Sequence, residues 1–470
     1  MGSKIADLTL APFLLVGPRQ RRPDRSLLVI RTFKRSVRQR FARALFALMG
    51  IGASRAGAQV PVAMVRDLLR DDAGLAGWVR TRSPTIAASS ARVAQAEADV
   101  GTSRLIPNPM VDFTVSDITI GRTNPAGLSY SDTSIYGVGL TEMVELGKRG
   151  PRIEAAELRL NATKKSAVTT LAERVAEARL ALGRVVYLKA KQDVISEELR
   201  SATAVSELEK VRLEQGALSG NDYDRLILDK MSLEVESSRA QADFAGALAG
   251  CREAMRASCD LSAATTDDLD AAAPVPQVVT DRGRLEARSD IEALRFEREA
   301  ALREAVLAGR RAIPDPAVRV GFTHDNLIVS GDQENTVSVG ILLPLPLFDH
   351  GQHDAARARA RATELDRTRE AALARAAADL EQLRARTELL AQGLSSLRGQ
   401  ALPKSQTILS TTAKAFDRGQ VSMTDLLLAR RTHVTLLLNV LALRFEFFAA
   451  RNELRRVLGL DIAPGRTGAP

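Results

Sequence analysis

The sequence of 470 residues contains an internal repeat, because three motifs recur in the same order at nearly constant spacing. The offsets between the two copies of these motifs are 207, 201 and 203 residues. A duplicated unit of this size constrains the fold more than any single motif does. The paired motifs are Ile-Pro-Asn-Pro at 106–109 with Ile-Pro-Asp-Pro at 313–316, Val-Gly-Leu at 138–140 with Val-Gly-Ile at 339–341, and Gly-Ala-Leu-Ser-Gly-Asn-Asp at 216–222 with Gly-Gln-Val-Ser-Met-Thr-Asp at 419–425.

The repeat divides the chain into five segments. We predict a leader at 1–58, a first structural repeat at 59–261, a linker at 262–283, a second structural repeat at 284–460 and a tail at 461–470. The linker is rich in Ala, Asp and Pro, which favours a loop. Within each repeat we expect a helix, two strands, a long helix and a further helix. The Ile-Pro-Asx-Pro motif is expected to end the first helix, because proline lacks the backbone N–H.

Four segments alternate strictly between apolar and polar or small residues, which predicts four β-strands. Such strands suit a membrane β-barrel, with lipid on one side and water on the other. An ordinary half-exposed soluble sheet has the same alternation, so both interpretations stay open at this point. The apolar positions are Val111, Phe113 and Val115; Tyr136, Val138 and Leu140; Val318, Val320 and Phe322; and Val337, Val339 and Ile341.

Two long stretches, 150–215 and 350–418, have heptad spacing and no strong helix stop except Pro403. That spacing is typical of coiled-coil helices, and about 65 residues at 1.5 Å each make a rod of roughly 100 Å. Globular enzymes seldom use two such rods, so the helices favour the membrane interpretation. Pro403 is expected to kink or interrupt the second rod. The heptad positions include Val168, Leu171, Val175, Ala178, Leu182 and Val185 in the first rod, and Leu373, Ala376, Leu380, Leu383, Leu390 and Leu394 in the second.

Four strands cannot close a membrane barrel by themselves, since the smallest bacterial outer-membrane barrels have eight. An open sheet edge cannot face lipid, so the chain is expected to oligomerise through its strands. Eight strands from two copies would be filled by side chains, whereas three copies supply twelve. The predicted fold is mainly α with a membrane β-barrel portion, a twelve-stranded trimeric barrel continued by a coiled-coil α-helical barrel. No run of 18 apolar residues follows the leader, so no transmembrane helix is predicted.

The formal charge of +9 comes from the leader. Of 66 Lys and Arg and 57 Asp and Glu, residues 1–58 hold 12 and 2, which leaves 54 basic and 55 acidic residues in the remainder. A nucleic-acid partner is therefore not expected. Basic residues at 34–43, an apolar stretch at 44–53 and Ala56-Gly57-Ala58 have the layout of a signal peptide, although an amphipathic surface helix is an alternative.

The only two cysteines, Cys251 and Cys259, are eight residues apart. Outside the cytoplasm they could form a local disulfide. Eight residues do not place two side chains on one face of a helix, so a bridge requires the helix to end between them. Two buried free thiols are the alternative, and a zinc site is not expected because companion ligands are missing.

These features resemble the TolC family of outer-membrane efflux proteins. The resemblance covers about residues 75–460 and is carried by the repeated strand–helix halves, the Glu-Leu-Gly-Lys-Arg segment at 145–149 and the paired Gly-x-x-Ser-x-x-Asp turns. Together with Leu-Ile-Pro-Asn-Pro at 105–109, the Glu-Leu-Gly-Lys-Arg segment is most similar to the CzcC and CnrC subgroup, which exports divalent heavy-metal cations.

The resemblance implies a homotrimer in the outer membrane, in contact with its lipid, with a helical tunnel in the periplasm. It also implies a periplasmic adaptor (a membrane fusion protein) and an inner-membrane RND transporter as partners. No cofactor is expected. The cargo would be nickel, cobalt, zinc or cadmium, with drug efflux or type I secretion as the alternative within the same fold.

The paired turns are expected to form the periplasmic tip, where the tunnel closes and the adaptor docks. In the family an acidic residue six positions after the tip glycine can line the aperture, and three copies would attract cations. Helix capping alone would explain the same residues, with glycine after one helix and Ser and Asp beginning the next. The candidate residues are Gly216, Ser219, Asp222, Gly419, Ser422 and Asp425.

The segment Asp-His-Gly-Gln-His-Asp at 349–354 makes His350 and His353 weak candidates for a transient cation site, against a plain polar junction between strand and helix. The sequence offers no Ser-His-Asp set, phosphate loop or HExxH motif, so an enzyme is not expected. An exported coiled-coil scaffold without a pore is the remaining alternative, but it would have no need of duplicated alternating strands.

Overall fold

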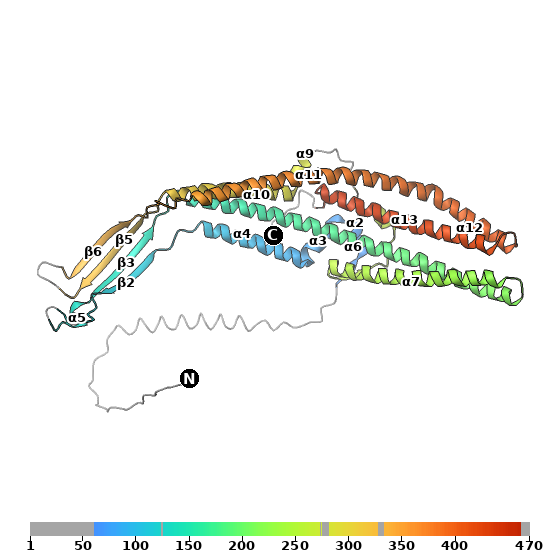
Figure 1. Ribbon diagram of the computed structural model, residues 1–470, viewed down its shortest axis with the longest axis horizontal. Helices are drawn as coiled ribbons and strands as arrows, with labels where there is room; N and C mark the ends of the chain where they lie inside the picture. Colours follow the sequence, from blue (N-terminus) through green and yellow to red (C-terminus); the bar gives the residue numbers. More distant parts are fainter. Residues whose placement is uncertain (1–60, 124–125, 273, 275–281, 328–332, 462–470) are drawn as a thin grey trace, which may run out of the picture. The chain divides into compact units, whose positions relative to one another are not determined.

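The computed structural model describes residues 61–123, 126–272, 274, 282–327 and 333–461, all within one compact unit that spans 60–470. The predicted leader at 1–58 and almost all of the tail at 461–470 lie outside the described residues. The unit is mainly helical, with a small sheet at one end of the long helices and two tight helix turns at the other (Figure 1).

Both halves of the described chain have the same element order, except that the long helix of the second half is divided into two. The first comprises α4 (Pro84–Ser103), β2 (Met110–Ser116), β3 (Ile135–Met143), α6 (Arg149–Glu214) and α7 (Gly220–Met255). The second comprises α10 (Ser289–Gly309), β5 (Ala317–Asp325), β6 (Asn335–Leu342), α11 (Gln352–Ser396), α12 (Leu402–Asp417) and α13 (Met423–Val457). The shorter elements are β1 (Val62–Met64), α2 (Val65–Arg70), α3 (Asp72–Arg82), α5 (Tyr130–Thr133), β4 (Ser258–Asp260), α8 (Asp267–Ala271), α9 (Arg282–Glu286) and η1 (Arg310–Ala312).

The four strands expected from alternation form one antiparallel sheet with the order β2-β3-β5-β6. Two hairpin pairs are joined through β3 and β5, so β2 and β6 are the edge strands. The sequence did not indicate a second sheet, in which β1 pairs in parallel with β4 near the middle of the helices. Strands of three residues are too short for alternation to be recognised.

The first rod, α6, is continuous over 66 residues, whereas the second is interrupted as Pro403 predicted. Between α11 and α12 the chain forms a π-helical segment, η2 (Leu397–Ala401). Proline supplies no N–H to the carbonyl four residues earlier and clashes with it. A π-bulge absorbs this defect without ending the helix.

The largest core cluster lies where α3, α6, α7 and α13 meet. Val168, the first heptad position of this rod, is half-buried, and the following positions Leu171, Val175, Ala178, Leu182 and Val185 are buried. Gly183 allows α6 to approach α13 closely, because a Cβ there would lie 2.2 Å from Cε1 of Phe448. The rods are therefore joined to the rest of the chain by a packed core and not by helix propensity alone.

A buried ionic cluster beside this core joins the beginning and the end of the described chain. Arg179 of α6 is fully buried and contacts Asp461 at 2.5 Å, Asp72 at 3.0 Å and the Asn452 side-chain oxygen at 2.9 Å. Arg455 contacts the same Asp72 at 2.6 Å. A buried charge is tolerated only when it is paired and hydrogen-bonded, so these contacts fix α3 and the end of α13 on α6.

By length and composition alone, α13 is apolar enough to cross a membrane, and it is the one such helix among the described residues. It contains no uninterrupted run of 18 apolar residues, which is the ground on which the sequence predicts no transmembrane helix. The helix packs along α6, α11 and α12 as part of the helical bundle. Of its most apolar stretch, 22% is buried against the rest of the described chain.

Candidate functional site

One face of the four-stranded sheet consists of exposed apolar side chains. The register places these residues in rows that run across all four strands. A contiguous apolar patch of this kind marks a surface that contacts membrane or protein. The two central rows are Phe113, Val138, Phe322 and Val337, and Val111, Leu140, Val320 and Val339.

The opposite face of the sheet is polar and includes an ion pair. Asp112 of β2 and Arg319 of β5 lie 2.5 Å apart, although β3 separates their strands. The pair passes over Gly139, where a Cβ would lie only 2.5 Å from an Asp112 oxygen and 3.0 Å from Nε of Arg319. A glycine at this position of β3 therefore gives the ion pair room on the face that is opposite to the apolar one.

At the other end of the helices, the turn between α6 and α7 is a tight cap. Gly216 has φ +76°, a conformation that favours glycine after a helix. The Ser219 hydroxyl oxygen accepts a hydrogen bond from the Asp222 amide at 3.1 Å and begins α7. The same hydroxyl donates to the Asp222 carboxylate at 2.7 Å. These are the capping interactions that the spacing allows.

The turn between α12 and α13 has the same geometry. Gly419 has φ +69°, and Ser422 and Asp425 form a reciprocal capping box. The Asp425 amide donates to the Ser422 hydroxyl oxygen at 3.2 Å, and the Ser422 amide donates to the Asp425 carboxylate at 3.1 Å. Hydrogen bonds from the Ser422 hydroxyl and then its amide hold the pKa of Asp425 below its usual value. The side chain is therefore a carboxylate anion at neutral pH, and its role at an aperture stays a prediction.

The two turns also contact each other, which the sequence did not indicate. Nη1 of Arg225 in α7 donates to the Thr424 hydroxyl oxygen in α13 at 2.8 Å. Farther from the turns, Arg430 of α13 pairs with Glu198 of α6 at 2.9 Å. A small apolar cluster lies between the two turns and includes Leu226, Met423 and Leu426, all buried.

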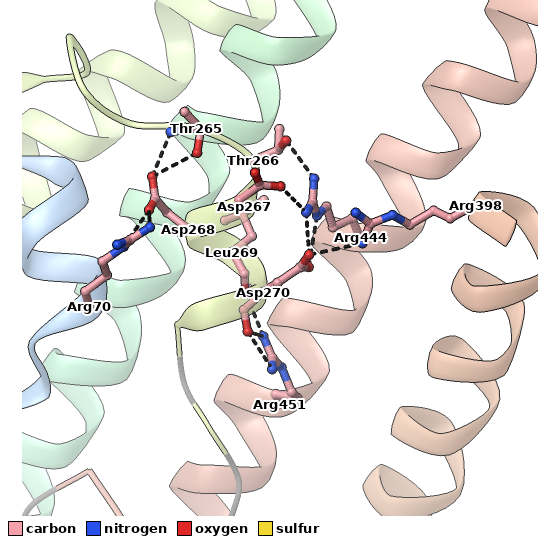
Figure 2. A network of polar contacts seen from close by, with 10 residues as sticks. All are labelled: Arg70, Thr265, Thr266, Asp267, Asp268, Leu269, Asp270, Arg398, Arg444 and Arg451. Carbon is pink, nitrogen blue, oxygen red and sulfur yellow. Dashed lines mark hydrogen bonds and ion pairs between the residues drawn. The ribbon is translucent and has the colours of Figure 1, made fainter. Parts of the chain in front are cut away.

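The described part of the predicted linker at 262–283 is not a free loop, because α8 is held between α2 and α13 (Figure 2). Asp268 is fully buried and accepts hydrogen bonds from Nε of Arg70 at 2.7 Å and from the Thr265 amide at 2.7 Å. Leu269 and Ala272 are buried beside it. The composition rich in Ala, Asp and Pro predicted a linker, and in the structure its carboxylates are partners of arginines that are distant in sequence.

On its other side α8 contacts two segments of the second repeat. Asp270 accepts a hydrogen bond from Nε of Arg444 at 2.9 Å and lies 3.1 Å from Arg398 in the π-helical segment (Figure 2). Burial opposes the charged form, but hydrogen bonds and charge from Arg444 and then Arg398 lower the pKa of Asp270. Arg451 donates to the main-chain carbonyls of Leu269 at 2.6 Å and Asp270 at 3.0 Å.

The structure joins Cys251 and Cys259 by a disulfide, with the Cα atoms 6.4 Å apart. The helix α7 ends at Met255, between the two cysteines, and Arg256 follows with φ +50°. This is the helix end that the spacing of eight residues requires. The bridge connects the end of α7 to β4 and through it to β1.

The weak metal candidates do not assemble a cluster. His350 and His353 are exposed at the junction before α11, and the neighbouring Asp354 pairs with Arg311 and with Arg357. Within the described residues, no group of three or more His, Cys, Asp or Glu side chains is arranged to hold a metal ion. The Asp354 carboxylate is thus engaged in ion pairs, and a transient cation site at His350 and His353 stays a prediction.

Comparison with known proteins identifies the architecture. Residues 284–460 match the family model described as outer membrane efflux protein. None of the curated proteins matches the sequence of this chain. The structure is similar to that of CusC, a transmembrane channel, with a TM-score of 0.72 at 16% identity over 82% of this chain and 91% of that one. The chain has the fold of an outer-membrane efflux channel.

Two further solved structures agree with this conclusion. The outer membrane protein VceC from Vibrio cholerae matches with a TM-score of 0.66 at 18% identity, and the match covers 83% of this chain and 96% of the VceC chain. The outer-membrane channel OprN has a TM-score of 0.69 at 18% identity, with 85% of this chain and 93% of its own covered. The matched family model is described as an efflux protein, and OprN is described as a channel.

Proposed function

We propose that this chain is one subunit of a passive outer-membrane exit duct, with its strands in the outer membrane and its long helices in the periplasm. The observation that carries the proposal is the sheet, which has an exposed apolar face and a polar face with the Asp112–Arg319 pair. Among the described residues, its two edge strands have no further strand partner. Lipid-facing and water-facing sides of a barrel strand require this division.

The proposed assembly is a homotrimer. A four-stranded sheet placed in lipid would leave the backbone groups of β2 and β6 without hydrogen-bond partners. Three copies supply twelve strands and leave an open lumen, whereas the interior of a barrel with eight strands is filled by side chains. Below the barrel, α6 with 66 residues would span about 100 Å of periplasm at 1.5 Å per residue.

The proposed partners are a periplasmic adaptor and an inner-membrane RND transporter, both of which would engage the end of the duct that carries Gly216 and Gly419. Asp222 and Asp425 stand on the first turns of α7 and α13 there, and three copies would give six carboxylates around the aperture. Such a ring holds a negative potential that favours cations.

The proposed cargo is a divalent heavy-metal cation, with nickel, cobalt, zinc and cadmium as candidates. This finer assignment is supported by the similarity of the 105–109 and 145–149 segments to the CzcC and CnrC subgroup. Both segments lie at the junction of sheet and helices, where Asp315 accepts from the Leu146 amide at 2.9 Å and pairs with Lys148 at 2.6 Å. Because these segments hold the sheet to the helices and do not bind cargo in this proposal, they do not determine what is exported. Drug efflux or type I secretion is therefore the alternative function.

The experiment is a gene deletion in the native cell, followed by growth on nickel, cobalt, zinc and cadmium salts and on a panel of drugs. Sensitivity confined to the metals would support the metal assignment, and sensitivity to drugs alone would remove it and leave the duct. A protein found in the soluble fraction that forms no conducting channel in planar bilayers would refute the duct and favour a scaffold.

A further inference from the structure

The chain segments that connect the sheet to the long helices form a junction with positive charge that the chain itself does not neutralise. We propose that this junction binds the phosphate head groups of anionic phospholipids, in the membrane leaflet that faces the periplasm. This inference rests on the proposed duct, which places the sheet in the membrane, and adds to it a lipid class and the residues that select it. The four segments of the junction are 104–109, 144–152, 310–316 and 343–355.

The four segments lie together at the end of the long helices that carries the sheet (Figure 1). Each segment contacts the next through a charged side chain, so the basic residues of all four are brought to one level of the molecule. The contacts that join consecutive segments are Arg149 with the Arg104 main-chain carbonyl at 2.9 Å, Lys148 with Asp315 at 2.6 Å, and Arg311 with Asp354.

The negative charge of the junction is already engaged within it. The four segments contain six Lys and Arg and four Asp and Glu. An engaged carboxylate is not free to oppose an anionic ligand, so the sign of the junction is decided by the basic residues that remain. The carboxylates and their partners are Glu145 with Arg152, Asp315 with Lys148, Asp354 with Arg311, and Asp349 with the Gly351 amide at 2.9 Å.

Two exposed arginines of the junction, Arg149 and Arg310, have no carboxylate within ion-pair distance among the described residues. They come close to each other at Gly147. A Cβ at Gly147 would lie 3.8 Å from Nη1 of Arg310, and Arg149 follows two residues later in the chain. Guanidinium groups bind phosphate oxygens through paired N–H donors. A phosphate that reaches both arginines would therefore neutralise charge that the chain leaves open.

The opposite end of the sheet has the reverse charge. Segments 117–134 and 326–334, which connect the strands there, contain one Arg and four Asp and Glu. The two ends of the strands therefore differ in sign, as is expected when they meet different surfaces. A surface of anionic lipid attracts nearby Lys and Arg, so the basic end fits such a leaflet and the acidic end does not.

Exposed apolar side chains accompany the arginines in the junction, which favours a lipid over free phosphate. Leu105 is 65% exposed, Leu345 is 66% exposed and Phe348 is 91% exposed. A phospholipid presents its phosphate directly beside its acyl chains, so a surface that holds it has to offer charge and apolar area together. A site for inorganic phosphate has no use for these side chains.

The test compares two lipids on the full-length, detergent-extracted protein. Native mass spectrometry measures the apparent affinity for phosphatidylglycerol and for phosphatidylcholine with the same acyl chains, which has no net charge. Each Lys or Arg near an anionic lipid raises affinity by about fivefold. We therefore expect Arg149→Gln with Arg310→Gln to weaken phosphatidylglycerol binding by about 20-fold and to leave phosphatidylcholine binding unchanged.

Two further double variants separate the site from overall charge and from folding. Arg122→Gln with Arg239→Gln removes the same charge from two exposed arginines outside the junction, and it should bind phosphatidylglycerol as the wild type does. Arg149→Lys with Arg310→Lys keeps the charge and should bind phosphatidylglycerol far more tightly than the glutamine variant. Equal losses in the lysine and glutamine variants would show that charge does not carry the binding.

An unchanged phosphatidylglycerol affinity in the glutamine variant, or an equal loss in the Arg122 and Arg239 control, would overturn the proposed lipid site. The duct would then still stand, because both lipids would bind the apolar face of the sheet. Binding of inorganic phosphate as tight as that of phosphatidylglycerol would overturn the choice of lipid as the ligand. A protein that stays soluble without detergent and retains neither lipid would refute the proposed duct as well.

Discussion

The close contact between Gly183 of α6 and Phe448 of α13 predicts that Gly183→Ala destabilises the protein. In most helix interiors, replacing glycine with alanine stabilises the protein by about 1 kcal/mol, because glycine loses more backbone entropy on folding. At Gly183 the added Cβ would lie 2.2, 2.7 and 2.9 Å from three carbons of the Phe448 ring. Carbon atoms in contact are normally about 3.5–4.0 Å apart, so the ring would have to move by more than about 1 Å.

The ring has little room for that movement. Phe448 is fully buried, and the Phe445 ring lies 6.2 Å from it, centroid to centroid. Phe445 is itself stacked on Tyr187 at 5.0 Å. Overpacking a site of this kind costs about 1–3 kcal/mol, and the rigid surroundings place Gly183→Ala at the upper end. After subtraction of the helix-propensity gain, we expect a net loss of about 2 kcal/mol in the free energy of unfolding.

The assay is urea unfolding of the purified protein in detergent, with midpoints compared at equal slope. Gly246→Ala is the matched control, because this glycine lies in the interior of α7 with no atom within 4 Å of the new Cβ, and it should raise stability. Adding Phe448→Leu to Gly183→Ala should recover part of the loss, which a double-mutant cycle measures as coupling. If Gly183→Ala stabilises the protein as much as Gly246→Ala does, the close approach of α6 and α13 does not limit packing and the reasoning is wrong.

Four further predictions concern the turn, the disulfide and α8. Asp425→Ala should raise single-channel conductance in planar bilayers, and an unchanged conductance would leave Asp425 as a helix cap only. Hydrogen bonds from Ser422 lower the pKa of Asp425 in the folded state. The ionised Asp425 should therefore contribute its full stabilisation above the unfolded-state pKa of about 3.9, and this stabilisation should be lost as the pH falls through the lower folded-state pKa. Melting temperatures measured across this pH range would detect the loss. Cys259→Ser should lower the free energy of unfolding by about 2–3 kcal/mol, the loop-closure value for a short bridge, and a dithiothreitol-treated native chain should melt at the same temperature as this variant. Asp270→Asn should cost about 1–2 kcal/mol, because the buried partner Arg444 loses a charge-assisted hydrogen bond. An unchanged urea midpoint would show that α8 is held by its apolar contacts alone.

The parts of the fold that could be predicted from the sequence are those set by local periodicity. Alternation identified the strands of the larger sheet, and the heptad rhythm identified α6 and the broken second rod. The break itself followed from Pro403, since the loss of one N–H has a local and known consequence. The Gly and Ser-x-x-Asp signals at the two turns likewise predicted the caps that the structure contains.

The parts that could not be predicted depend on partners far away in the sequence. Arg179 has no local signal of burial, and its partner Asp461 lies 282 residues away. The Asp residues of α8 had the composition of a loop, whereas their partners Arg444 and Arg70 are supplied by other helices. Long-range ion pairs leave no periodic trace in the sequence, so the docked connection between the repeats was visible only in the structure.

The two halves of the chain are alike in some regions and different in others, and the division has a physical reason. Both halves keep the same alternation of apolar and polar side chains along their strands, and both keep the helix caps of the two turns. In the proposed duct these features determine which side chains face lipid, water or the aperture. The two halves differ near the middle of the long helices, where the disulfide, α8 and the ionic cluster around Arg179 each occur once among the described residues. Contacts that hold a chain to itself need no counterpart in the other half. In the proposed homotrimer, the strands of one half meet the strands of the other half in the next copy, so their alternation has to match. A shift of one residue would place polar side chains on the apolar face along a whole strand.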